Sequence, residues 1–101
     1  MSYHGIDIPR ERIAEFCRRH RIRRLALFGS ILRDDFTPES DIDVLVELDA
    51  DARIGLLTFV GIQEELAAFL GRRVDLNTPE CLGRRFRHEV LKDARDQYVA
   101  A

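Results

Sequence analysis

Apolar residues recur along the chain with two different periods, and each period predicts one kind of element. Positions three or four residues apart predict helices over residues 9–21, 56–70 and 82–98. Short apolar runs bounded by Gly, Pro or polar residues predict strands over 24–28, 41–48 and 73–77. A short helical turn over 30–33 and a loop over 34–40 separate the first two strands. This order predicts an α+β fold in which a small mixed β-sheet packs against helices.

The strand predicted over 41–48 has two different faces, because successive side chains of a strand point to opposite sides. One face carries Ile42, Val44, Val46 and Leu48, which we expect in the core. The other face carries Asp41, Asp43, Leu45 and Glu47. The pleat therefore separates two carboxylates at the start of the strand from the core.

Length and composition narrow the function classes. A chain of 101 residues fits one domain, 1–101, and a formal net charge of -2 argues against non-specific binding to a nucleic-acid duplex. The cations are almost all arginine, which favours bidentate contacts with phosphate and carboxylate groups. Cys17 and Cys81 have no metal-ligand spacing, and no apolar run approaches membrane-spanning length. We therefore expect a cytoplasmic protein that makes no membrane contact.

One stretch carries the chemistry: Gly29-Ser30, followed after ten residues by Asp41-Ile42-Asp43. A Gly-Ser turn offers backbone N–H groups and a hydroxyl to an anion. Two carboxylates on one strand face are oxygen ligands of the kind that Mg²⁺ prefers. Asp-x-Asp alone is common in solvated turns, but here it opens a buried strand just after the Gly-Ser turn. The combination predicts a site for a metal-bound nucleoside triphosphate, with Asp75 on the next strand as a third carboxylate.

The residues Leu27-Phe28-Gly29-Ser30, Arg33 and Ser40-Asp41-Ile42-Asp43-Val44-Leu45-Val46-Glu47 resemble a known family. They look like the minimal nucleotidyltransferases (MNT) of the DNA polymerase beta superfamily. The resemblance implies the nucleotidyltransferase fold of that superfamily and a magnesium-dependent transfer of AMP from ATP.

Residue by residue, the resemblance implies that Gly29 and Ser30 hold the β- and γ-phosphates. It also implies that Asp41 and Asp43 ligate two magnesium ions. Asp75 is then the third acid, and Arg33 a further phosphate contact. The chain carries Asp34 where many members of the family have Gly after that arginine.

Members of this branch pair with a HEPN-family toxin, so the resemblance also implies an antitoxin that transfers AMP to a tyrosine of such a partner. Two alternatives remain open from the sequence. The chain could neutralise its toxin by binding alone, or it could act on RNA or a small molecule. A chain this small has no domain for a second substrate, which favours a homo-oligomer or a hetero-complex.

Two arginine-rich stretches have more than one interpretation. The run from Arg18 to Arg24 is either a solvated helix end or a contact for a nucleic acid or an acidic partner. Arg84, Arg85 and Arg87 surround Phe86, and this cluster is either ordinary surface or an interface to a partner protein.

Overall fold

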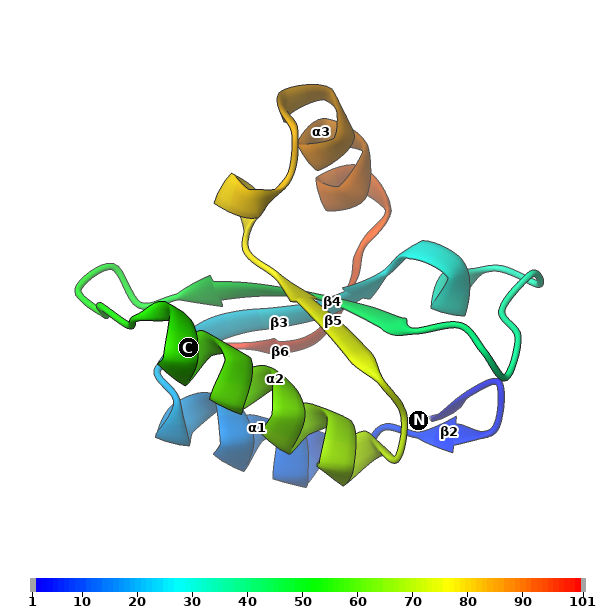
Figure 1. Cartoon of the computed structure of the whole chain (residues 1–101), viewed down its shortest axis with the longest axis horizontal. Coiled ribbons are helices and arrows are strands. Elements are labelled where there is room, and N and C mark those ends of the chain that lie inside the picture. The colour runs from blue at the N-terminus through cyan, green and yellow to red at the C-terminus, as the bar shows by residue number, and fades with distance from the viewer. Residues whose placement is uncertain (1, 101) are drawn as a thin grey trace.

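The computed structural model describes residues 2–100 (Figure 1). Its elements follow in this order: β1 (Ser2–Tyr3), β2 (Ile6–Asp7), α1 (Arg10–Arg19), β3 (Ile22–Phe28), the 3₁₀ turn η1 (Gly29–Leu32), β4 (Ile42–Leu48), α2 (Leu56–Leu70), β5 (Val74–Asn77), the 3₁₀ turn η2 (Pro79–Cys81), α3 (Arg84–Asp93) and β6 (Arg95–Val99). No helix among these residues is long and apolar enough to cross a membrane.

Four strands form a mixed sheet in the order β5-β4-β3-β6. The β3–β4 and β3–β6 pairs are antiparallel, whereas β4 and β5 run parallel. A parallel pair needs a crossover, and α2 supplies it between β4 and β5. The predicted α+β architecture with a small mixed sheet is confirmed.

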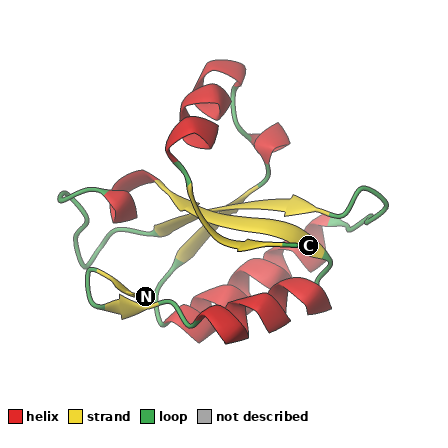
Figure 2. Cartoon of the chain, turned by 180° about the vertical axis from the view of Figure 1, so that it is seen from behind, coloured by secondary structure: helices red, strands yellow, loops and turns green. Residues whose placement is uncertain are grey.

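Helices cover both faces of this sheet, as Figures 1 and 2 show from opposite sides. The helices α1 and α2 lie together against one face, and α3 stands alone on the other. The larger hydrophobic cluster fills the first interface and includes Phe16 of α1, Leu66 of α2 and Val44 of β4. A smaller cluster beneath α3 joins Ala26, Phe28, Leu45, Leu82 and Val90.

The pleat of β4 distributes its side chains between these two cores. Ile42, Val44 and Val46 belong to the larger core, as their alternation predicts. Leu45, on the same face as the acids, is completely buried under α3. On the acidic face α3 therefore covers the middle of the strand, and Asp41 and Asp43 lie at its solvent-accessible start.

The prediction of one continuous helix over residues 82–98 is wrong. The helix α3 ends at Asp93, Ala94 adopts extended backbone angles, and residues 95–99 form β6 against β3. The i+4 spacing of Leu82, Phe86, Val90 and Ala94 suggested a longer helix. Without β6, the apolar strand β3 would present an unpaired edge to solvent, so tertiary pairing overrides local propensity here.

The first residues also form structure that the sequence did not predict. The strands β1 and β2 pair as a small hairpin whose connecting residues, His4 and Gly5, both have positive φ, of 51° and 79°. A two-residue hairpin turn of type I′ requires positive φ at both central positions. The His4 ring stacks on Phe36 and its Nε2 lies 3.0 Å from the Ile31 carbonyl oxygen. The hairpin therefore packs against η1 and the loop that follows it.

Candidate active site

The strand β4 sets the two candidate acids beside their neighbours by its pairing register. Asp43 is the register partner of Phe28 on β3 and of Asp75 on β5. Asp43 is half-buried between these strands, whereas Asp75 on the edge strand is exposed. The structure thus brings Asp43 and Asp75 together across a parallel pair, although they are far apart in the sequence.

Gly29 lies against Asp43 so closely that no side chain fits between them. A Cβ placed on Gly29 would overlap Oδ2 of Asp43 and lie 3.1 Å from its Cγ. Gly29 also has φ +76°, a left-handed conformation that glycine adopts without strain. The close approach to Asp43 and the positive φ both arise at one turn, because β3 ends and η1 begins directly beside the start of β4.

The environment of Asp43 disfavours its charged form. Burial, then the neighbouring carboxylates of Asp75 and Asp41, raise the pKa of Asp43 from 3.8 to about 6, while Arg33 offsets part of the rise. A hydrogen bond with the Asp75 carboxyl acts in the same direction. Carboxylates held so close together are typical of a site that receives a cation.

Asp41 points to a different partner from that of Asp43. Its Oδ1 lies 3.0 Å from Nε of Arg73, just before β5. Among residues 2–100, no group of three or more His, Cys, Asp and Glu side chains converges in a way that could hold a metal ion. The Asp43–Asp75 pair still fits a divalent cation, because two carboxylates in contact repel each other. In this structure Asp41 contacts Arg73 instead of this pair.

Arg72 and Arg73 hold the loop that leads into β4, a role that the sequence analysis missed. Nη2 of Arg72 donates to the carbonyl oxygens of Thr37 and Ser40, at 2.9 and 2.7 Å. Nη2 of Arg73 donates to the Glu39 carbonyl oxygen at 2.7 Å. Their position in the sequence could have indicated this role. They come just before β5, and because β5 runs parallel to β4, they lie beside the residues just before β4. These arginines therefore fix the position of Asp41 and Asp43 at the start of β4.

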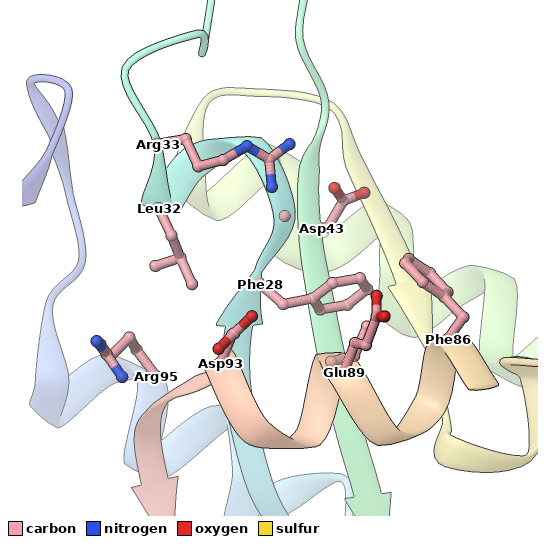
Figure 3. A pocket seen from close by; sticks show the side chains of 10 residues that line it. Phe28, Leu32, Arg33, Asp43, Phe86, Glu89, Asp93 and Arg95 are labelled. Carbon is pink, nitrogen blue, oxygen red and sulfur yellow. The ribbon is translucent and has the colours of Figure 1, made fainter. Parts of the chain in front are cut away.

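A pocket of about 440 Å³ opens beside Asp43, between η1 and α3 (Figure 3). Gly29 and Arg33 line it on the η1 side, and Figure 3 shows the Arg33 guanidinium on the same side as the Asp43 carboxylate. Ser30 follows Gly29 in η1 and is half-buried, and Asp34 lies exposed after Arg33. Of the six predicted site residues, Gly29, Ser30, Arg33, Asp43 and Asp75 therefore gather around one end of β4, with Asp41 turned aside.

A family model described as the nucleotidyltransferase domain matches residues 10–98. The chain belongs to this nucleotidyltransferase family. The prediction of a minimal nucleotidyltransferase is thereby confirmed at the level of the family.

Two relatives of this nucleotidyltransferase are named as protein adenylyltransferases. The protein adenylyltransferase MntA of Thermococcus cleftensis is 34% identical over 79 residues, which cover 78% of each chain. A protein of Methanocaldococcus jannaschii named as a putative protein adenylyltransferase is 31% identical over 92 residues, or 91% of this chain and 97% of the relative.

Solved structures share the fold. One that is described as a putative minimal nucleotidyltransferase matches with a TM-score of 0.70 and 34% identity, over 84% of this chain and 85% of that chain. A toxin–antitoxin structure with AMP-PNP matches with a TM-score of 0.73 and 19% identity, over 92% of this chain and 75% of that chain. At that identity the second match shows the fold alone.

Much of the first basic stretch of this nucleotidyltransferase is neutralised within the molecule. Arg21 pairs with Asp51 at 2.5 Å, and Arg24 pairs with Glu47 at 2.9 Å and with Asp96 at 2.7 Å. Arg19 pairs with Glu65 at 2.6 Å. These contacts favour the interpretation as a solvated, self-paired surface over that of a nucleic-acid contact.

We expect Gly29→Ala to displace the Asp43 carboxylate. Gly71 offers a matched control, because it also has positive φ (+74°) but nothing lies within 4 Å of the position that a Cβ would take there. Both Ala variants should lose about 1–2 kcal/mol through left-handed backbone strain, measured by urea unfolding. Only Gly29→Ala should change the pKa of Asp43, measured by NMR titration of the side-chain carboxyl. An unchanged Asp43 titration in Gly29→Ala would contradict the close approach.

We expect Asp43→Asn to stabilise the metal-free protein near neutral pH. A carboxyl whose pKa is raised by folding holds its proton more tightly when folded, so stability falls as the pH rises from its ordinary value toward 6. The full shift corresponds to roughly 3 kcal/mol, which screening of this half-exposed group reduces to about 1 kcal/mol.

Thermal unfolding with a chelator measures this effect. Asp43→Asn should melt about 4–8 °C above the unmodified chain at about pH 8, and the difference should vanish at about pH 3. Asp34→Asn, at an exposed carboxylate, is the control and should leave the melting temperature unchanged at both pH values. Equal melting of Asp43→Asn and the unmodified chain at the higher pH would show that neither burial nor the neighbouring acids disfavour the charged form of Asp43.

Proposed function

We propose that this nucleotidyltransferase transfers AMP from ATP to a hydroxyl group of a partner protein. The partner is a HEPN-family toxin, the acceptor is one of its tyrosines, and the chain acts as the antitoxin in the cytoplasm. The observation that carries the proposal is the register that sets Asp43 opposite Asp75 and against Gly29. A phosphoryl-transfer site needs such a cluster of acids next to an anion-binding turn.

The similar proteins support the choice of acceptor class. Relatives that are 31–34% identical over most of the chain are named protein adenylyltransferases. Structures with the same fold include the MntA–HepT toxin–antitoxin complex and a tri-AMPylated HEPN toxin of Shewanella oneidensis with its MNT antitoxin. The AMP-PNP in another of these structures supports ATP as the donor.

Each residue of the site has a proposed role. Gly29 and Ser30 offer backbone N–H groups and a hydroxyl to the β- and γ-phosphates, and Arg33 adds a cation on the same side. Asp41, Asp43 and Asp75 would hold Mg²⁺, which when bound neutralises the charge that develops on the phosphoryl oxygens. Asp75 lies exposed on the edge strand, where an acceptor hydroxyl of a partner can reach its carboxylate and pass it the proton.

The experiment is the intact mass of a HEPN partner encoded beside this chain, after the two proteins are co-expressed. We expect the partner to gain mass in whole adenylyl units. The Asp41→Asn/Asp43→Asn variant should lose the transfer by about a thousandfold or more, which corresponds to roughly 4 kcal/mol of transition-state stabilisation.

Asp49 and Asp51 provide a matched control, since they repeat the Asp-x-Asp spacing but pair with Arg21 outside the site. Asp49→Asn/Asp51→Asn should retain the transfer. If the partner gains no mass but still co-purifies with the chain, and the double site variant still protects cells, the chain neutralises its toxin by binding alone. Mass gain with the double site variant would contradict the assigned acids.

A further inference from the structure

The pocket beside Asp43 continues beyond the residues that the proposed phosphate and metal contacts use. It extends under α3, where Phe86, Glu89, Val90 and Asp93 line it. Positions 89 and 90 lie three and four residues after 86, and 93 lies four and three residues after them, so they form one stripe along the helix. The stripe faces Phe28 and the start of β4, and Figure 3 shows the Glu89 and Asp93 carboxylates on this side of the helix.

Two aromatic rings form an apolar wall of this pocket. Phe28 is 5% exposed and belongs to the small core under α3, so its ring is fixed. Phe86 is 53% exposed, and its ring meets that of Phe28 edge-to-face, with centroids 6.5 Å apart and planes at 70°. A large ring exposed at a pocket mouth suits a planar ligand, which gains stacking energy from it.

Two carboxylates make the pocket selective for hydrogen-bond donors. None of the ion pairs within residues 2–100 includes Glu89 or Asp93, so both remain free to accept. Ionised carboxylates only accept hydrogen bonds. They repel phosphate groups and carbonyl oxygens and accept from an amino group. Arg95 also lines this part of the pocket, so the carboxylates disfavour the triphosphate there without excluding it.

We propose that the pocket under α3 holds the nucleobase of the donor nucleotide, and that it selects bases with an exocyclic amino group. Phe86 stacks on the base, and Glu89 and Asp93 accept hydrogen bonds from its amino group. This inference rests on the proposed function, because the triphosphate at Gly29 and Ser30 places the nucleoside beside Asp43. The base then lies on the Phe28 side of Asp43, opposite Asp75, so that the acceptor approaches from the free edge of the sheet.

Two pairs of nucleotides test the selection, because within each pair a carbonyl oxygen replaces the exocyclic amino group and the adjacent ring nitrogen gains a proton. These are ATP with ITP, and CTP with UTP. Calorimetric titration in the presence of Mg²⁺ should show that the amino member of each pair binds about tenfold more tightly, the effect of one hydrogen bond to a charged group. Inorganic tripolyphosphate, which has no base, reports on the phosphate contacts alone.

Isosteric variants assign the selection to α3. Glu89→Gln and Asp93→Asn each add an amide N–H that can donate to a carbonyl oxygen, so ITP and UTP should gain affinity and the preference should fall to about threefold or less. If Glu89 and Asp93 had only a structural role, their amide variants would not bind ITP and UTP more tightly. Glu64→Gln, at an exposed position on α2, is the control and should keep the full preference. Phe86→Ala should weaken ATP and CTP alike and leave tripolyphosphate binding unchanged.

The outcomes separate this inference from the proposed function. Equal binding of ATP and ITP, or a preference that both α3 variants retain, overturns the inference. So does a Phe86→Ala variant that changes the affinity for the protein acceptor and not for ATP. In all three cases, tripolyphosphate binding with persisting AMP transfer would leave the proposed function standing. If neither nucleotides nor tripolyphosphate bind, both ideas fail.

Discussion

The contact between Gly29 and the carboxylate of Asp43 is the constraint on which the rest of the site depends. It exists only because β3 and β4 pair in the register that sets Phe28 opposite Asp43. A shift of one residue would turn Asp43 into the larger core and bring Ile42 to the site face. The full burial of Ile42, Val44 and Val46 opposes that shift, so the hydrophobic core fixes the position of the acids.

Both faces of the sheet are used, but differently. The face under α1 and α2 carries a continuous core, which supplies most of the apolar burial. The opposite face carries only a small core under α3, and Asp43 lies beside this core but outside it. The helix α3 thus closes one side of the site and leaves the edge strand β5 uncovered. A chain of 101 residues obtains a site with one closed and one open side in this way.

The sequence predicted the central elements because each of them satisfies a local rule. β4 alternates between apolar and acidic residues except at Leu45, and Gly71 ends α2 in the left-handed conformation that its position suggested. β6 was missed because Arg95 to Val99 carries no apolar alternation: its signal is the empty edge of β3, which appears only after the sheet is assembled. The approach of Asp75 to Asp43 likewise depends on a register between strands that no local pattern sets. The turn of Asp41 toward Arg73 depends on the same parallel pairing.

For the proposed transfer, the different exposure of the two sides of Asp43 favours one order for the two substrates. On the Phe28 side the walls come from β3, η1 and α3, so this side is formed by the chain itself and can bind a small donor without help. On the Asp75 side the strand β5 is the last of the sheet, and among the described residues no further strand pairs with it, although Leu76 N donates to Oε1 of Gln63 on α2. An acceptor there must bring its own surface, which a nucleotide cannot do and a folded partner can. The asymmetry therefore favours a protein acceptor that docks on a chain already loaded with its nucleotide.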